Sequence, residues 1–254
     1  MTAGEMRARV IAGVVERVAR SSERASFVLR GGVLTRAWVA PVPRAARDVD
    51  YVGVFDYDVA DATARLARAL ATPVADDVAL DLTALRGVPI WAGSPFPGVR
   101  ATLPAGLDEP AFELSIDVGF RDPLVPPPVD LELAGTTGPV AVRAVRPETQ
   151  LAWKLHGLAE MRADWRPKDL HDAQLVVAHC ALDDDALARA IAAAFSSRGY
   201  PRAAATSLLA DPRWATKTAR TRWDREPPLA DAIAALRARL DPVLATLPDW
   251  ELPR

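Results

Sequence analysis

Two aspartates two residues apart, Asp48 and Asp50 in the stretch RDVDYVG, are the residues of this sequence best suited to chemistry. On a β-strand their carboxylates project from one face while Val49 points to the other. Two neighbouring negative charges favour a bound cation, and Mg²⁺ prefers carboxylate oxygens while leaving positions open for phosphate. The other interpretation is an acidic strand end in water, and the spacing alone leaves both open.

A third carboxylate and a pair of glycines accompany these aspartates. Asp117 lies within LSIDVGF, where a carboxylate on a core strand is costly unless it has a partner or a metal. Gly31 and Gly32 end a predicted strand just before a predicted helix, where backbone N–H groups can hold phosphate. A glycine pair is also common in ordinary tight turns, so the order of the three features is more informative than any one of them.

The elements that must position these residues fall into two groups. Periodicity predicts helices at 5–20, 33–40 and 59–71, and strands at 26–30, 47–55, 78–82, 99–103, 111–120 and 140–145. Four prolines in 123–128 predict a loop, and from Glu148 onward the periodicity is helical. We therefore predict an α+β protein: a mixed sheet with flanking helices over 1–146, followed by a helical domain over 147–254 that completes an active-site cleft.

Composition limits the class of protein. The 254 residues carry a formal net charge of −2, so no global field attracts the chain to nucleic acid or to an anionic membrane. Cys180 is the single cysteine, which excludes an internal disulfide and a cysteine-based zinc cluster. Arginine and glutamate interrupt the first 20 residues, and no apolar run approaches the length of a membrane span. These features predict a cytoplasmic protein without a membrane partner.

Three short motifs together resemble a known superfamily. LRGG at 29–32, DVD at 48–50 and IDV at 116–118 are similar to the signature of the DNA polymerase beta type nucleotidyltransferases. Further along, PETQLAWKLHGL at 147–158 and RPKDLHDAQLV at 166–176 resemble the nucleotidyltransferase AbiEii/AbiGii toxin family, which includes the MenT toxins. The resemblance extends from about Phe27 to Val177, and the combination of the carboxylates with KDLHD is its most specific part.

The resemblance implies catalytic roles for five residues. Asp48 and Asp50 would hold Mg²⁺, and Asp117 would complete the metal site and help to activate the acceptor hydroxyl. Lys154 would contact the triphosphate, and Asp169 would complete the active site from the helical domain. The implied chemistry is an in-line displacement at the α-phosphorus, in which the metal neutralises developing charge and pyrophosphate leaves.

The resemblance also implies a nucleotide-binding set with two departures from the family pattern. Gly31 and Gly32 would line the phosphate turn, and Arg44 matches an arginine that commonly precedes the first aspartate. Val33 stands where the family usually has Ser or Thr, and Ala46 stands where it has Thr. We therefore expect metal binding to be retained and catalysis to be weaker than usual.

The function implied is that of a toxin-like enzyme that transfers a nucleotide from an NTP to an RNA 3′-hydroxyl, with tRNA as the expected acceptor and a separate antitoxin as regulator. A second interpretation replaces RNA with a small molecule or a protein hydroxyl. A third is a nucleotide- or protein-binding module that has lost catalysis. Residues 198–225 contain seven basic and two acidic residues interleaved with Tyr200, Trp214 and Trp223. This segment is either an RNA surface or a solvated face over buried tryptophans.

Other residues have simpler explanations that the pattern leaves open. Lys154 would also be accounted for by a lysine extending from an apolar helix to water. Asp169 would be stabilised in a first helical turn whatever its function, and Asp172 either does the same or faces solvent. The His171–Asp172 pair lacks the further histidines of a metal phosphohydrolase, and His179 with Cys180 is better explained as core filling.

Overall fold

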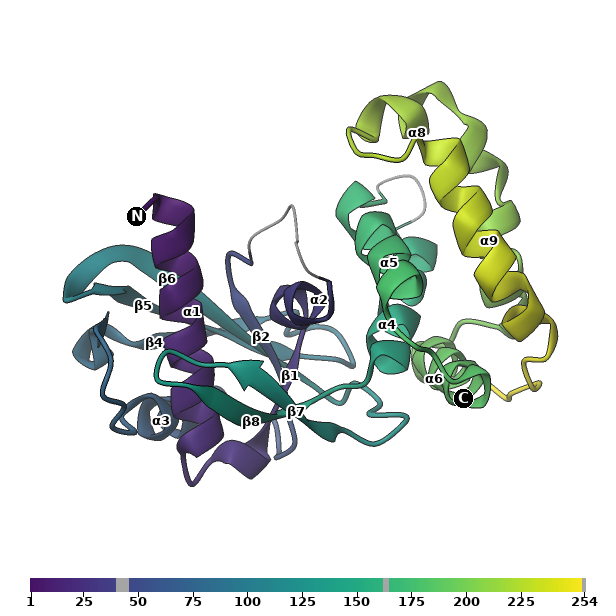
Figure 1. Ribbon diagram of the computed structural model, residues 1–254. Helices are drawn as coiled ribbons and strands as arrows, with labels where there is room; N and C mark the ends of the chain where they lie inside the picture. Colours follow the sequence, from purple (N-terminus) through teal and green to yellow (C-terminus); the bar gives the residue numbers. More distant parts are fainter. Residues whose placement is uncertain (40–45, 162–164, 253–254) are drawn as a thin grey trace. The chain divides into compact units, whose positions relative to one another are not determined.

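The computed structural model describes residues 1–39, 46–161 and 165–252, and the chain divides into two compact units (Figure 1). The first unit comprises Met1–Asp122 and Pro128–Val145, and the second comprises Pro123–Pro127 and Arg146–Arg254. The first contains a mixed sheet with helices, and the described part of the second is helical. The predicted fold class is therefore confirmed.

The first unit is built on one eight-stranded sheet with the order β3-β5-β6-β2-β1-β8-β7, to which β4 adds by pairing with β5. The β2–β6 and β1–β8 pairs are parallel and the other pairs are antiparallel. The strands are β1 (Phe27–Arg30), β2 (Val49–Gly53), β3 (Val78–Leu80), β4 (Arg86–Ile90), β5 (Gly98–Leu107), β6 (Glu109–Phe120), β7 (Val129–Ala134) and β8 (Pro139–Ala144). The helices of this unit are α1 (Ala3–Arg20), α2 (Gly32–Trp38) and α3 (Val59–Leu70).

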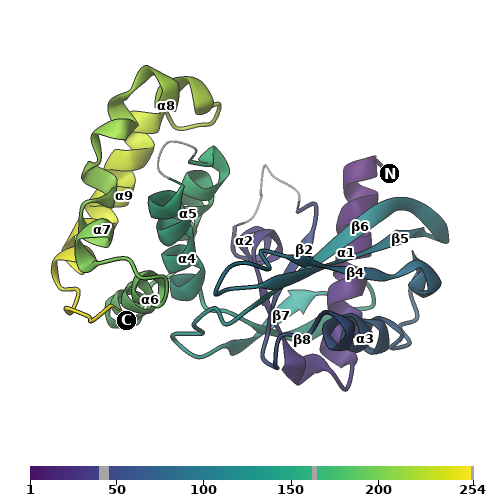
Figure 2. The same ribbon diagram turned by 180° about the vertical axis from the view of Figure 1, so that it is seen from behind.

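Helix α1 lies across the sheet, as Figures 1 and 2 show from opposite sides. It begins with a capping box in which Thr2 and Glu5 each satisfy the backbone N–H of the other, and it buries Val10 and Val14 completely. In strand β5 the side chains alternate between buried and exposed positions. Val99 is fully buried, whereas its neighbour Arg100 projects from the opposite face. One face of the β5–β6 ladder is thus core, and the other is available for polar chemistry.

Two strands, β4 and β7, were absent from the sequence prediction, and that part of the prediction is wrong. Strand β4 contains Gly87 and Pro89, and both residue types are unfavourable in strands. The strand forms nevertheless, because it pairs with β5 along one side, where the missing N–H of Pro89 is tolerated. Strand β7 reads VDLELA, whose Leu, Glu and Ala suit a helix, and it is strand only because it pairs with β8. Both errors come from tertiary pairing that overrides local propensity.

The second unit packs helices around a core that includes Leu151, Leu155 and Phe195, all at most 2% exposed. Its helices are α4 (Pro147–Glu160), α5 (Pro167–His179), α6 (Asp184–Ser197), α7 (Arg202–Thr206), α8 (Lys217–Arg222) and α9 (Leu229–Ala245). Helices α4 and α5 each begin with a proline at the first helical position, where no N–H is needed. Across the described ranges of both units, no helix combines the length and apolarity that crossing a membrane requires.

Candidate functional site

The register of the sheet brings Asp50 and Asp117 together. On the parallel strands β2 and β6, Asp50 and Asp117 are directly opposite each other. Asp50 is half-buried and Asp117 is only 8% exposed. Asp48 is also half-buried, but it lies in a bend immediately before β2, so the prediction that it is part of the strand is wrong by one residue.

Asp117 has the partner that its burial requires. Arg100 on β5 is its cross-strand neighbour and donates two hydrogen bonds to it, from Nε to Oδ1 at 2.8 Å and from Nη2 to Oδ2 at 2.7 Å. The bonds to Asp117 and its charge, with smaller contributions from Asp48 and Asp50, raise the pKa of Arg100. Sequence reasoning missed Arg100, although an arginine at the polar phase of the strand GVRATL is a usable signal.

A row of alternating charge therefore crosses four strands of the sheet. Arg30 on β1 is paired in register with Asp50, which is opposite Asp117, which in turn is opposite Arg100. The Nη1 of Arg30 also forms an ion pair with Asp122 at 2.7 Å. Cations on both sides of two neighbouring carboxylates allow them to stay close together on one face.

The glycine turn adjoins the same carboxylate. Gly31 has φ 78° and ψ −150°, a conformation that essentially only glycine adopts, and it is the N-cap of α2. A Cβ built on Gly31 would lie 2.1 Å from Asp50 Oδ2, whereas one on Gly32 would meet Ala46 Cβ at 3.7 Å, an ordinary contact. The backbone of Gly31 therefore borders the Asp50 carboxylate, and the side chain that is absent makes this approach possible.

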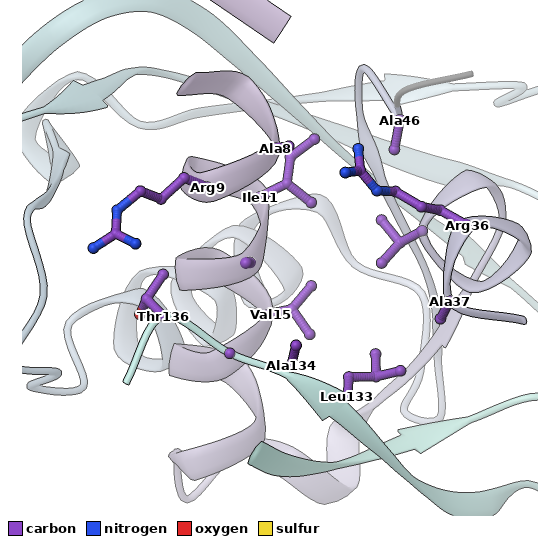
Figure 3. A pocket seen from close by; sticks show the side chains of 13 residues that line it. Ala8, Arg9, Ile11, Val15, Arg36, Ala37, Ala46, Leu133, Ala134 and Thr136 are labelled. Atoms are coloured by element: carbon purple, nitrogen blue, oxygen red, sulfur yellow. The ribbon is translucent and has the colours of Figure 1, made fainter. Parts of the chain in front are cut away.

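The two residues that depart from the family pattern line a cavity. Val33 and Ala46 are among the residues around a space of about 380 Å³ that α1, α2, the end of β7 and the segment after it also line (Figure 3). The lining is mostly apolar, with Arg9 and Arg36 on opposite sides. Neither Asp50 nor the other aspartates line it, so we place the candidate site on the carboxylates rather than in this cavity. Arg44, predicted to bind nucleotide, lies outside the described residues.

In the second unit, Lys154 is held between two buried carboxylates. Its Nζ donates to Asp169 Oδ1 at 2.8 Å and forms an ion pair with Asp172 Oδ2 at 2.9 Å. Asp169 also pairs with Arg166, from Oδ2 to Nε, at 2.9 Å. Asp172 is 3% exposed, so the interpretation that it faces solvent is wrong, and Lys154 reaches carboxylates rather than extending only to water.

The electrostatics of this cluster favour the charged forms of Lys154 and Asp169. Burial alone would lower the pKa of Lys154, but the charges and hydrogen bonds of Asp169 and Asp172 outweigh it and raise that pKa. Burial alone would raise the pKa of Asp169, but Lys154, Arg166 and Lys168 lower it. The ammonium thus keeps two donors committed to carboxylates while its side chain remains 16% exposed.

His156 and His171 serve the core, whereas His179 is exposed and Cys180 is half-buried, so the prediction that these last two fill the core is wrong. His156 packs edge-on against Phe195 and Tyr200, and His171 packs against Trp223. Burial, with a smaller contribution from Glu148, raises the pKa of Cys180 to about 11, so its thiol is protonated at neutral pH.

The tryptophans of 198–225 are also core residues. Trp214 and Trp223 are 7% and 9% exposed, and their indole N–H groups donate to the carbonyls of Leu208 and Pro227. They are therefore not platforms on which a base can stack. The exposed basic residues that remain on α8 are Lys217, Arg220 and Arg222.

The chemistry of the Asp48, Asp50 and Asp117 set fits a hard divalent cation, since all donors are carboxylate oxygens and two of the residues face each other in register. As the side chains stand, no three or more His, Cys, Asp or Glu in the described ranges are arranged to hold a metal ion. In this arrangement both oxygens of Asp117 accept hydrogen bonds from Arg100.

Comparison with known proteins adds the following findings. The model of the family described as "Nucleotidyl transferase AbiEii toxin, Type IV TA system" matches residues 14–251. A crystal structure of a proposed nucleotidyltransferase from H. pylori is similar with a TM-score of 0.54 and 14% identity, covering 94% of this chain and 93% of that one. JHP933 from Helicobacter pylori is similar with a TM-score of 0.52 and 13% identity, covering 95% and 91%. No curated protein sequence matched. At such identities the two structures show the fold alone.

Proposed function

Because this chain belongs to the AbiEii family of nucleotidyltransferase toxins, we propose that it transfers a nucleotide from an NTP to the 3′-hydroxyl of an RNA, with tRNA as the expected acceptor. Membership of a type IV toxin–antitoxin family also implies an antitoxin partner and an NTP substrate. The observation that carries the proposal is the in-register pair Asp50 and Asp117 beside the Gly31 turn.

The carboxylates Asp48, Asp50 and Asp117 would hold Mg²⁺. When bound, the metal supplies a positive charge that stabilises the phosphoryl oxygens and the leaving pyrophosphate. Asp117, the most buried of the three, would accept the proton of the acceptor hydroxyl or orient that hydroxyl. The backbone of Gly31 and Gly32 would follow the phosphates, since Gly31 already borders Asp50 without an intervening side chain.

Lys154 and Asp169 have the corresponding roles from the second unit. Lys154 would contact the triphosphate with a compact charge, using the part of its ammonium not committed to carboxylates. Asp169 would fix the position of that ammonium through its 2.8 Å bond. Both residues remain ionised over a wide pH range, because each shifts the pKa of the other toward the charged form.

The acceptor is proposed to meet the exposed basic residues of α8. Lys217 and Arg220 lie about one turn apart on this helix, and both side chains are exposed. Arg222, the last residue of the helix, is also exposed. A short cationic helix suits the phosphate backbone of RNA rather than its bases.

A transfer assay tests the proposal directly. The protein is incubated with each of the four α-labelled NTPs, Mg²⁺ and total tRNA, with periodate-oxidised tRNA as the acceptor control. We expect labelled tRNA and released pyrophosphate, and no label on the oxidised RNA. Asp50→Asn and Asp117→Asn should each lower the rate by about 100-fold or more, since both would bind the metal. Glu113→Gln is the matched control, because Glu113 is an exposed carboxylate on the same strand as Asp117.

The same assay also distinguishes the alternative acceptors and the alternative function. Label in a small-molecule or protein fraction, but not on RNA, would move the proposal to those acceptors. Binding of NTP without any transfer would support a binding module. Equal rates for Asp50→Asn, Asp117→Asn and Glu113→Gln would rule out the proposed carboxylate site.

A further inference from the structure

Arg100 occupies the position at which a cation is needed beside Asp117. Its guanidinium meets both carboxylate oxygens in a two-bond fork, at 2.8 and 2.7 Å. Such bidentate charge-assisted pairs are among the stronger hydrogen bonds in proteins. Because both oxygens are engaged, the fork competes with any other ligand of that carboxylate.

Asp50 is the next carboxylate along the row, since it lies opposite Asp117 in the register of β2 on β6, and Asp48 precedes it by two residues. Arg100 thus flanks the Asp50–Asp117 pair on the β5 side, as Arg30 flanks it on the β1 side. Without Arg100, only Arg30 would offset the repulsion between the two like charges in register.

Arg100 is also free to move away. Its side chain is 46% exposed, whereas that of Asp117 is 11% exposed. The residue opposite it on β4 is Val88, which is itself 51% exposed. Rotation into water therefore costs Arg100 little desolvation, in contrast to a buried pair.

We propose that Arg100 is the resident counter-cation of the carboxylate site and that a divalent metal must displace it from Asp117 in order to bind. This inference rests on the proposed metal-binding role of Asp48, Asp50 and Asp117. Arg100 then acts as a positioning residue: it holds Asp117 in place in the metal-free protein and sets the affinity at which the metal enters.

The decisive measurement is the affinity of the protein for metal in the absence of nucleotide. Removing an arginine that only stabilised the structure would weaken metal binding, whereas removing an arginine that competes with the metal should strengthen it. Mn²⁺ is titrated into the full chain, and free Mn²⁺ is followed by electron paramagnetic resonance. We expect Arg100→Gln to bind Mn²⁺ about threefold to tenfold more tightly than wild type, as one partly exposed competing pair is lost. The same variant without metal should unfold at a lower temperature and gain more from added Mn²⁺.

Matched variants separate competition from general charge effects. Arg86→Gln removes an exposed arginine from the neighbouring strand β4 and should change Mn²⁺ affinity by less than twofold. Arg100→Lys keeps the charge but not the fork, and it should fall between wild type and Arg100→Gln; it also serves if Arg100→Gln fails to fold.

One outcome would overturn this inference and leave the metal site in place. It is that Mn²⁺ binding requires Asp50 but that Arg100→Gln binds Mn²⁺ no more tightly than Arg86→Gln. Binding that is unaffected by Asp50→Asn in every background would overturn the metal site and the inference with it.

Discussion

The carboxylate of Asp50 lies over the α-carbon of Gly31, so close that a Cβ on the glycine would be 2.1 Å from Asp50 Oδ2. Two independent constraints therefore require glycine at this turn: the positive φ of residue 31 and the close approach of the Asp50 side chain. The next residue, Gly32, has neither constraint, because its own Cβ would make only an ordinary contact at 3.7 Å.

Replacing the two glycines by alanine should consequently have opposite effects on stability. Gly31→Ala combines backbone strain with a clash and should lower the free energy of unfolding by about 2 kcal/mol or more. Gly32→Ala places a good helix former at the first position of α2 and should be neutral or stabilising by up to about 1 kcal/mol. Urea titration of both variants measures this difference, and similar losses in the two would contradict it.

Removing the ammonium of Lys154 should destabilise the second unit strongly. Lys154→Met leaves Asp169 and Asp172 buried without their cation, and the expected loss is about 3–5 kcal/mol. The exposed Lys217→Met should change stability by less than about 0.5 kcal/mol. Adding Asp169→Asn and Asp172→Asn to Lys154→Met should recover part of the loss in thermal denaturation; no recovery would mean that the pairing does not explain it.

Lys154→Arg tests function separately from charge. The guanidinium preserves the charge but not the compact geometry that places two donors on Asp169 and Asp172. We expect a lower transfer rate with a stability loss much smaller than that of Lys154→Met. Transfer at the wild-type rate would show that any cation suffices there.

The stability of the first unit should decline in acid because of Glu16 in α1. Burial opposes ionisation of this carboxylate, but the hydroxyls and backbone N–H groups of Thr136 and Thr137 outweigh it and lower its pKa from 4.5 to about 2. The unfolded chain therefore binds the proton first as pH falls, so the contribution of Glu16 is complete above about pH 4.5 and is lost toward pH 2. Glu16→Gln should cost about 1–3 kcal/mol at pH 7 and flatten the decline over that range, as measured by urea unfolding at several pH values. Glu113→Gln, at an exposed position, should leave the wild-type decline in place.

Charge reversal on α8 should weaken RNA use without affecting the nucleotide. Lys217→Glu together with Arg220→Glu should raise the KM for tRNA about tenfold or more at low salt and reduce the slope of log affinity against log salt by about 2. The KM for NTP should not change. Arg189→Glu, on an exposed position of α6, is the charge control. Equal effects of the α6 and α8 variants would argue against a specific RNA surface on α8.

Some of this protein was determined by local sequence alone. The amphipathic stripe of α1, the proline starts of α4 and α5, and the glycine turn at Gly31 follow from short-range rules of periodicity, capping and backbone freedom. The requirement that Asp117 have a partner also followed from the cost of a buried charge.

The rest depends on contacts between residues far apart in the chain. That Asp50 faces Asp117 is set by the register of β2 on β6, and that the partner of Asp117 is Arg100 is set by the register of β5 on β6. Strands β4 and β7 exist because neighbours pair with them, and Asp172 is buried because α4 and α5 pack together around Lys154. Pairing energies between distant segments are absent from any local pattern, so only the tertiary structure decided which charges meet.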